Sequence, residues 1–193
     1  NSTNAFTVTA GGTPKVQTQN PFQVNTGVSY YFDGTGDYLI APSTQFQNFN
    51  FGTGDFTIEG WAYITGINGT ANGIFQQGTS FPVNATTNTS ALGTVTTGQV
   101  WQIYANGAQN NSVATWTTNT WYHVAYSRAS GTNRLFVNGN SCTVSGAVTN
   151  QMNSGGNTLT IGKGLYTGYT SPTTGYISNM RVTKGGALYT STF

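Results

Sequence analysis

From about residue 28 onward, apolar and polar residues alternate in short runs that are separated by Gly, Asn, Asp and Ser. The runs recur at spacings of roughly 8 to 12 residues, which is typical of the strands of an all-β sandwich or barrel. The expected strands lie within residues 28–32, 37–41, 55–64, 72–78, 99–105, 121–128, 133–139, 157–163 and 175–183. No segment carries apolar residues at helical spacing over three turns, so the pattern also predicts almost no helix.

Turn residues mark the ends of several expected strands. Asn138-Gly139 follows the sequence Arg-Leu-Phe-Val at 134–137, and Asn-Gly most readily takes the positive φ angles of a tight turn. We therefore expect a β-hairpin within residues 133–144. The tetrapeptide Gly-Thr-Gly-Asp occurs at 34–37 and again at 52–55, each time directly before an alternating run. We interpret both copies as the same turn, in which Gly allows a left-handed backbone and Asp binds amides two residues on.

Two segments lack this alternation. Residues 1–27 contain two prolines and a Gly pair, which predicts an extended arm or linker rather than a packed element, with the domain proper at residues 28–193. Residues 79–97 are rich in small polar residues, which predicts a long surface loop or a weak edge strand. Because the chain does not begin with Met, we expect a processed protein or a piece of a longer one.

The composition describes a polar chain with few charges. Of its 193 residues, 13% are aromatic and only 5% are charged, against an average of about 25% for soluble proteins. The length suits one domain with one core, and the aromatic content favours folding over disorder. The six basic residues are scattered, so we expect no nucleic-acid partner. No run of about 18 apolar residues is present, so we expect no membrane insertion.

Five blocks of the sequence, taken in their order along the chain, can be compared with a known family. They are residues 30–42 (YYFDGTGDYLIAP), 51–64 (FGTGDFTIEGWAYI), 121–140 (WYHVAYSRASGTNRLFVNGN), 161–164 (IGKG) and 175–193 (GYISNMRVTKGGALYTSTF). Together they resemble the laminin G-like branch of the concanavalin A-like jelly rolls. The resemblance implies an all-β, two-sheet antiparallel β-sandwich with one concave sheet. It also implies that a ligand or partner binds on the concave face or at the loops of one rim.

The closing block carries a further resemblance. A strand of the type G-x-I-S-N-x-R-V followed by K-G-x-A-L-Y is similar to domains of tail-fibre and capsid-decorating proteins of bacterial viruses, notably marine ones. This resemblance implies a location at the virion surface, outside the cell. It also implies that the arm, residues 1–27, binds other virion proteins, and that the protein assembles as a homo-oligomer.

The carboxylates bear on whether the chain is an enzyme. Glycoside hydrolysis normally needs two carboxylates, and jelly-roll hydrolases that resemble laminarinases carry two Glu and an Asp at alternate positions of one strand. This chain has one Glu, Glu59, and its neighbours on the same strand face are Thr57, Trp61 and Tyr63. His123 lies between alternating aromatic residues, which favours a structural strand residue held by a hydrogen bond. We therefore expect no catalytic residues and no enzyme.

Calcium is the alternative explanation for the acidic residues between Phe32 and Trp61. Calcium binds six to eight oxygen ligands and can use Asp carboxylates together with loop carbonyls. Asp33 and Asp37 are the candidate calcium ligands, and no other cofactor is expected. Each of these residues neighbours Gly in a turn-like setting before a strand, however, and a role in binding the backbone of the turn is sufficient. We favour the turn interpretation and keep calcium as the alternative.

Aromatic residues beside amides indicate a glycan ligand, because aromatic rings stack on the apolar faces of sugars and amides bind their hydroxyls. The wider set includes Trp121 and Tyr122, and each of these rings could instead belong to the core. For each tryptophan we favour a place in the core, and Trp101 and Trp116 are the two that we rank as more exposed than the others. The candidate ligand-binding residues are Trp61, Tyr63, Trp101, Tyr104, Trp116 and Asn106.

These observations together favour a non-enzymatic virion surface protein, either a tail-fibre or a capsid-decorating adhesin, that contacts host-surface glycans. Two alternatives remain open. In the first, the chain is a carbohydrate-recognition module of a larger bacterial surface or secreted protein. In the second, it is a structural spacer without affinity for sugars.

Overall fold

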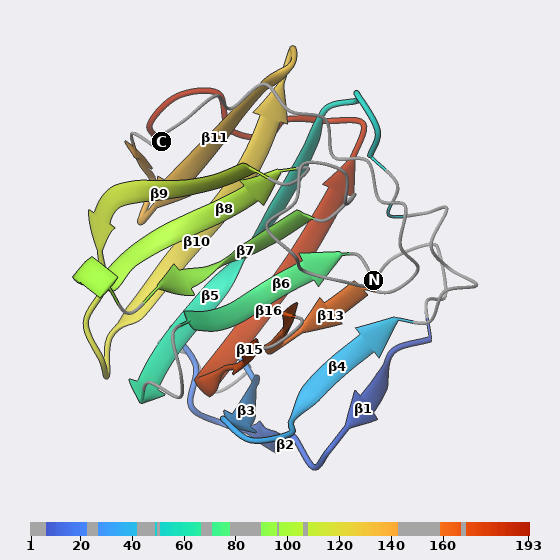
Figure 1. The fold of residues 1–193 in the computed structure, drawn as a ribbon, viewed down its shortest axis with the longest axis vertical. Coiled ribbons are helices and arrows are strands. Elements are labelled where there is room, and N and C mark those ends of the chain that lie inside the picture. The colour runs from blue at the N-terminus through green and yellow to red at the C-terminus, as the bar shows by residue number, and fades with distance from the viewer. Residues whose placement is uncertain are drawn as a thin grey trace.

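The computed structural model describes residues 7–22, 27–41, 49, 51–66, 71–77, 90–95, 97–105, 108–142, 159–166 and 169–193. Within these ranges the chain forms two packed antiparallel sheets, as the sequence predicted (Figure 1). The same ranges contain a single turn of 3-10 helix, η2 (Thr97–Gln99), and no helix that could span a membrane.

One sheet, which we call the β6 sheet, has seven strands in the described residues. In spatial order these are β1 (Thr9–Gly11), β4 (Tyr38–Ala41), β13 (Leu159–Ile161), β6 (Ala71–Gln77), β7 (Ser90–Val95), β8 (Val100–Ala105) and β9 (Ala108–Thr115). Strand β7 lies inside this sheet between β6 and β8, and Leu92 on it is fully buried. The expectation of a loop or edge strand is therefore wrong for Ser90–Val95, because pairing on both sides stabilises a strand whose own residues are mostly small.

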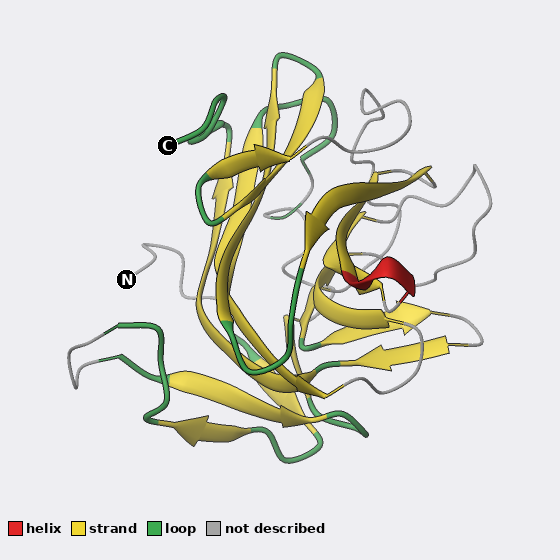
Figure 2. Ribbon diagram, turned by 90° about the vertical axis from the view of Figure 1, so that its left-hand side faces the viewer, coloured by secondary structure: helices red, strands yellow, loops and turns green. Residues whose placement is uncertain are grey.

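The other sheet, which we call the β5 sheet, also has seven described strands. Their spatial order is β12 (Asn140–Cys142), β11 (Thr132–Val137), β10 (Trp121–Ala129), β5 (Phe56–Gly66), β16 (Thr174–Lys184), β3 (Ser29–Asp33) and β2 (Lys15–Gln17). A separate hairpin is formed by β14 (Lys163–Tyr166) and β15 (Tyr169–Pro172). The two sheets face one another across the core, and the C-terminal segment lies on the outer side of the β5 sheet (Figure 2).

The backbone conformation of the expected turns is confirmed. Asn138 and Gly139 have φ angles of 49° and 80° and connect β11 to β12, so both central residues take the left-handed conformation of a hairpin turn. Gly34 and Gly52, the first residues of the two Gly-Thr-Gly-Asp copies, have φ angles of 79° and 53°. The copies lead directly into β4 and β5.

The segment before residue 27 contributes to both sheets. Thr9–Gly11 pairs with β4, and Lys15–Gln17 pairs with β3. These six residues are extended, as expected, but they are edge strands of the sandwich, which corrects the expectation that they do not pack. The sandwich offers open strand edges, and an extended polar segment can satisfy their backbone groups. The domain boundary near Gly27 stays a prediction.

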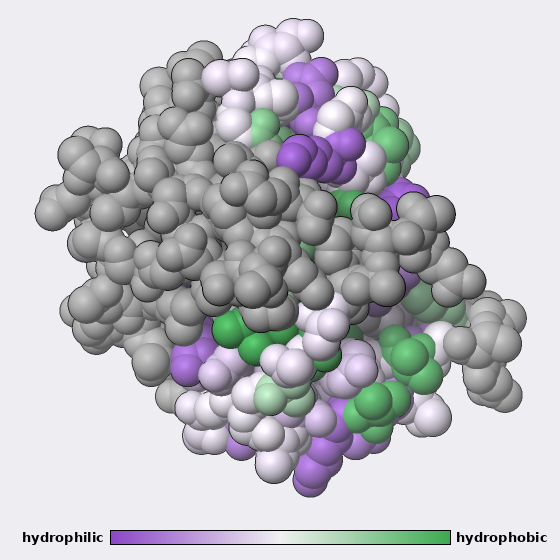
Figure 3. Space-filling view, turned by 90° about the vertical axis from the view of Figure 1, so that its right-hand side faces the viewer, coloured by the Kyte–Doolittle hydropathy of each residue, from purple (hydrophilic) through white to green (hydrophobic). Residues whose placement is uncertain are grey.

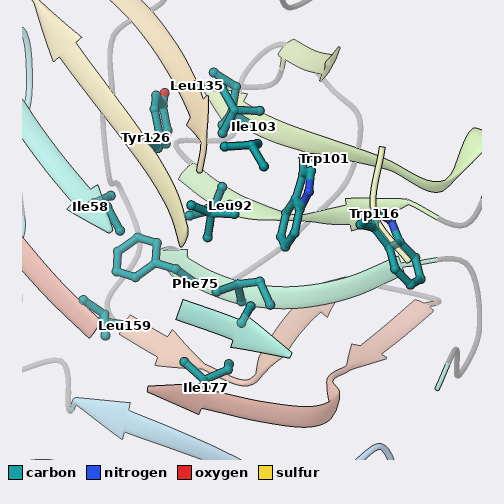
Figure 4. Close-up of a cluster of buried hydrophobic side chains, with 14 of the residues drawn as sticks. Ile58, Phe75, Leu92, Trp101, Ile103, Trp116, Tyr126, Leu135, Leu159 and Ile177 are labelled. Atoms are coloured by element: carbon teal, nitrogen blue, oxygen red, sulfur yellow. The ribbon is translucent and has the colours of Figure 1, made fainter. Parts of the chain in front are cut away.

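Large apolar side chains from both sheets fill the core (Figure 4). Ile58 and Tyr126 come from the β5 sheet, and Phe75, Leu92 and Trp101 come from the β6 sheet; all five are fully buried. On the face shown in Figure 3, apolar, weakly polar and strongly hydrophilic residues are interspersed, as the small share of charged residues leads one to expect.

Candidate functional site

Four aromatic side chains form a continuous row across the outer face of the β5 sheet. Tyr31 on β3 pairs with Tyr176 on β16, Tyr176 pairs with Tyr63 on β5, and Tyr63 pairs with Trp121 on β10. The ring centroids of these pairs are 5.0, 5.8 and 5.2 Å apart. All four residues are half-buried, so each ring has part of its surface in solvent. We call Tyr31, Tyr176, Tyr63 and Trp121 the four-ring row.

The alternation of β5 explains why this row faces outward. Ile58, Ala62 and Ile64 point into the core and are almost completely buried. Because successive side chains of a strand point to opposite faces, Tyr63 points away from the core. Directly opposed residues of neighbouring strands lie on the same face, so the register carries the row from strand to strand.

Trp61 lies beside the four-ring row, two residues before Tyr63 and on the same face of β5. Its ring lies 5.8 Å from that of Phe22 and 5.3 Å from that of His123. Trp61 is half-buried, and Phe22 is 37% exposed. Aromatic surface accessible to solvent therefore extends from the four-ring row toward the middle of the β5 sheet.

Glu59 precedes Trp61 on the same face and is nearly buried. Its Oε1 atom accepts a hydrogen bond of 2.6 Å from Arg181 Nε, and Arg181 Nη2 also forms an ion pair with it. Its Oε2 atom accepts a bond of 2.6 Å from the Tyr189 hydroxyl and lies 3.1 Å from His123 Nε2. Burial raises the pKa of Glu59, but the bonds from His123, Tyr189 and Arg181 outweigh it and lower the pKa to about 2. Glu59 is therefore a fixed anion, and the hydrogen bond expected for His123 is confirmed.

The C-terminal segment, residues 185–193, packs over this part of the outer face. The Tyr189 and Phe193 rings are stacked at 3.7 Å, and both contact the ring of Phe136, which is fully buried. The Leu188 amide donates to Thr57 Oγ1 at 2.8 Å. The segment covers the end of β5 that contains Glu59, whereas the rings of the four-ring row stay partly exposed.

The predicted aromatic residues divide into two groups. Trp61 and Tyr63 share the outer face of the β5 sheet. Trp101 and Trp116 are 0% and 1% exposed and belong to the core between the sheets (Figure 4). The core position favoured for each tryptophan is confirmed for these two, but the ranking of Trp101 and Trp116 as the more exposed ones is wrong, since Trp61 and Trp121 are half-buried. Trp101 pairs with Thr94 in the interior of the β6 sheet, and its indole ring fills core volume that small residues of β7 leave open.

Two predicted ligand residues lie beyond what the structure describes. Asn106 falls outside the described residues, and for Tyr104 only the backbone, in β8, is described. Sequence reasoning also missed Tyr31 and Tyr176. The alternation in residues 28–32 and 175–183 could have assigned each to a face. It could not have shown that the two strands are neighbours.

The candidate calcium ligands, Asp33 and Asp37, accept hydrogen bonds from backbone amides. Asp33 accepts bonds from the Thr35 amide at 2.8 Å and the Thr35 hydroxyl at 2.7 Å, and these bonds lower its pKa. Asp37 is nearly buried and accepts bonds from the amides of Thr13 at 2.6 Å and Asp33 at 3.3 Å. Asp55 likewise accepts a bond from the Ser130 amide at 2.9 Å. All three acids bind backbone amides, but only Asp33 binds one two residues on. That part of the turn interpretation is therefore wrong for Asp37 and Asp55, the acids of the two Gly-Thr-Gly-Asp copies.

A wider cluster of metal-binding side chains is not found in the ranges given above. There, no three His, Cys, Asp or Glu residues gather as metal ligands would. Calcium binding through Asp33 and Asp37 stays a prediction, and the hydrogen bonds of both side chains support the turn interpretation.

Solved structures of similar fold include a domain of an arabinanase, a sialidase and the binding domain of a neurotoxin. Domain 4 of AbnA, an extracellular GH43 arabinanase from Geobacillus stearothermophilus, in complex with arabinotriose, is 15% identical, with a TM-score of 0.67, over 96% of this chain and 86% of that one. A Trypanosoma rangeli sialidase is 17% identical, with a TM-score of 0.61, over 91% of this chain and 28% of that one. The binding domain of botulinum neurotoxin DC, in complex with rat synaptotagmin II, is 13% identical, with a TM-score of 0.62, over 95% of this chain and 44% of that one.

At these identities the likeness shows the fold alone. The chain spans little more than a quarter of the sialidase. No curated protein matches the sequence. Residues 32–188 match a family of laminin G-like domains, and this match includes strands of both sheets, from β4 to β16. The chain therefore belongs to the concanavalin A-like lectin/glucanases superfamily.

Proposed function

We propose that this domain recognises glycans without transforming them, and that the four-ring row is its binding surface. The observation that carries this proposal is the register that aligns Tyr31, Tyr176, Tyr63 and Trp121, with centroid distances between 5.0 and 5.8 Å, on an outer face. Half-buried rings offer apolar surface for the C–H faces of sugars, and hydroxyl and indole groups at their edges can bind sugar hydroxyls.

The shape of the row favours an extended chain over a single sugar. The rings come from four neighbouring strands, so the row runs across the strands along the surface of the sheet. Neighbouring strands are about 4.8 Å apart, and several sugar units would have to lie along the row to contact all four rings. A polysaccharide can do this, whereas a monosaccharide would contact one or two rings.

The absence of catalysis is part of the proposal, and the surroundings of Glu59 support it. A general acid must carry a proton near the working pH, but a pKa of about 2 keeps Glu59 ionised. Both carboxylate oxygens are also engaged by Arg181, Tyr189 and His123. The family description includes glucanases, so the proposal commits this chain to the lectin side of the superfamily.

We place the domain on a virion surface, as a tail-fibre or capsid-decorating adhesin that contacts host glycans. The resemblance of residues 175–193 to such proteins supports this assignment, as does the low charge of the chain. Other virion proteins would bind through residues 1–27, and a homo-oligomer would present several rows at once. In that case, weak contacts at single rows would add up to strong attachment.

A second function is favoured by one comparison. Domain 4 of the arabinanase has nearly the same extent as this chain and was solved with arabinotriose. By analogy, this chain would be a carbohydrate-recognition module of a larger bacterial surface or secreted protein. Size measurements on the intact chain separate the two: the virion assignment predicts an oligomer, and the module predicts a monomer.

The proposed glycan binding can be tested on the purified chain with calorimetry against a panel of bacterial-envelope and algal polysaccharides. We expect saturable binding that Tyr31→Ala and Tyr63→Ala weaken at least tenfold. Tyr30→Ala is the matched control, because Tyr30 adjoins Tyr31 on β3, points to the opposite face and is 38% exposed. Absence of binding to the whole panel, or equal loss in the Tyr30 variant, would overturn the proposal and favour a structural spacer.

A further inference from the structure

The four-ring row continues into a charged residue at the edge of the β5 sheet. Lys15 on the edge strand β2 pairs directly with Tyr31 on β3, so its side chain lies on the same face as the row. Lys15 is exposed. The sequence Lys15, Tyr31, Tyr176, Tyr63, Trp121 thus crosses five neighbouring strands, with a cation at one end and four rings behind it.

We infer that the four-ring row binds an acidic polysaccharide, and that Lys15 selects it by pairing with a carboxylate or sulfate group of the chain. This inference rests on the proposed function and names the ligand class for the same surface. Sugar rings of the ligand lie on Tyr31, Tyr176 and Tyr63, and its acidic group lies beyond Tyr31, where the Lys15 ammonium is available.

The charges around the row support Lys15 over Arg181, which also lies on this face. Arg181 is already bound to Glu59, which neutralises it. For Lys15, no carboxylate partner lies within ion-pair distance in the described part of the chain. An unpaired exposed ammonium can pair with an incoming anion without first breaking an internal ion pair.

One acidic residue lies near this end of the row. Asp33 is on the same face of β3 as Tyr31, two residues further along the strand. Its carboxylate oxygens accept hydrogen bonds from the amide and hydroxyl of Thr35. Its negative charge disfavours an acidic group of the ligand on its own side of Tyr31.

Edge lysines also have a purely structural role, because a charge on an edge strand discourages pairing with another sheet. A lysine with that role alone would not distinguish an acidic glycan from a neutral one. The two roles therefore differ in a measurable way, which is the preference between ligands that share a backbone and differ only in charge.

The test uses two matched pairs of polysaccharides with the complete chain: polygalacturonate against its carboxyl-reduced form, and carboxymethyl cellulose against hydroxyethyl cellulose. In at least one pair we expect the acidic member to bind about threefold or more tightly, with a preference that falls as salt is raised. Lys15→Gln should abolish this preference, and Lys15→Arg should retain it. Lys184→Gln is the control, since Lys184 is also exposed on the β5 sheet but lies at the opposite end of β16 from Tyr176.

Three results overturn the inference. They are equal binding of both members of each pair, an unchanged preference in Lys15→Gln, and no binding to any of the four polymers. The proposed function is tested separately with Tyr63→Ala. It is supported if this variant weakens binding to any glycan of the panel, whatever affinities the Lys15 variants show. It fails if no glycan binds.

Discussion

The hydroxyl of Tyr189 donates a hydrogen bond of 2.6 Å to Glu59 Oε2, although 130 residues separate the two in the sequence. This bond joins the C-terminal segment to the middle of the β5 sheet. Arg181 and His123 complete the surroundings of the carboxylate. The anchored segment covers Phe136 and leaves the rings of the four-ring row partly exposed. The hydrogen bonds of Glu59 therefore help to define where the candidate site ends.

Tyr189→Phe removes this donor and keeps the ring. A hydrogen bond to a charged group contributes roughly 1.5 to 3 kcal/mol, so we expect the free energy of unfolding to fall by about 1 to 2 kcal/mol. Hydrogen exchange of the Leu188 and Phe193 amides should become faster, and the pKa of Glu59 should rise. Denaturant titration and exchange measurements check this. Tyr176→Phe, whose hydroxyl lies away from Glu59, serves as the control, and equal effects in both variants would contradict the anchoring role.

The stability of the protein should depend on the ionisation of Glu59. The fold lowers the pKa of this group from its ordinary value of 4.5 to about 2. The stabilisation is therefore complete above about pH 4.5 and is lost as the pH falls toward 2. Glu59→Gln should be less stable than the wild type at pH 7 and should lose less stability between pH 5 and pH 2. Glu59 is the single glutamate, so its carboxyl carbon signal can be titrated directly by NMR; a midpoint near 4.5 would contradict the prediction.

The core and the site should respond differently to loss of an aromatic ring. Trp101 and Trp116 are buried between the sheets, so alanine at either position should cost about 3 to 5 kcal/mol of stability. Tyr63→Ala removes a half-buried ring and should cost less, while weakening glycan binding at least tenfold. Thermal unfolding and calorimetry on the three variants separate the two effects. A stable Trp101→Ala protein with impaired binding would contradict the assignment of Trp101 to the core.

Gly175 allows the close approach of β16 and β5 at a β-bulge next to the four-ring row. Its φ angle is 146°, and a Cβ atom there would collide with the carbonyl oxygen of Tyr63. Gly175→Ala should therefore lower the free energy of unfolding by about 2 kcal/mol or more and displace Tyr63 and Tyr176, which weakens glycan binding. Gly186→Ala is the control, because a Cβ there meets only Thr183 Cγ2 at 3.8 Å. Unchanged stability and binding in Gly175→Ala would contradict this account.

Asp37 should stabilise the chain with or without calcium. Its bonds to the amides of Thr13 and Asp33 join the N-terminal segment to the turn before β4. Asp37→Ala should lower the free energy of unfolding by about 1 to 3 kcal/mol in calcium and in chelator alike, because two partly buried amides lose their charged acceptor. Asp33→Ala, at an exposed position, should cost less. If micromolar calcium raises the melting temperature of the wild type and Asp37→Ala abolishes the rise, the acid is a metal ligand instead.

Local patterns were sufficient for much of the architecture. The alternation of residues 55–64 placed Glu59, Trp61 and Tyr63 on one face, because the side-chain period of a strand is a property of the backbone itself. Asn138-Gly139 predicted the hairpin for a similar reason, since the φ angles of the turn depend on these two residues. The regular backbone geometry of strands and turns thus made the sandwich predictable from short stretches of sequence.

The tertiary structure alone decided which of these residues meet. Tyr31 and Tyr176 are 145 positions apart in number, and only the pairing of β3 with β16 brings their rings to 5.0 Å. The register of β16 on β5 shifts between Ser178 and Arg181, and no local signal gives the position of such a bulge. The sequence by itself determined the strands, the turns and the faces of single strands. Strand order, register and the burial of Trp101 and Trp116 depend on packing between distant segments, and these decided the candidate site.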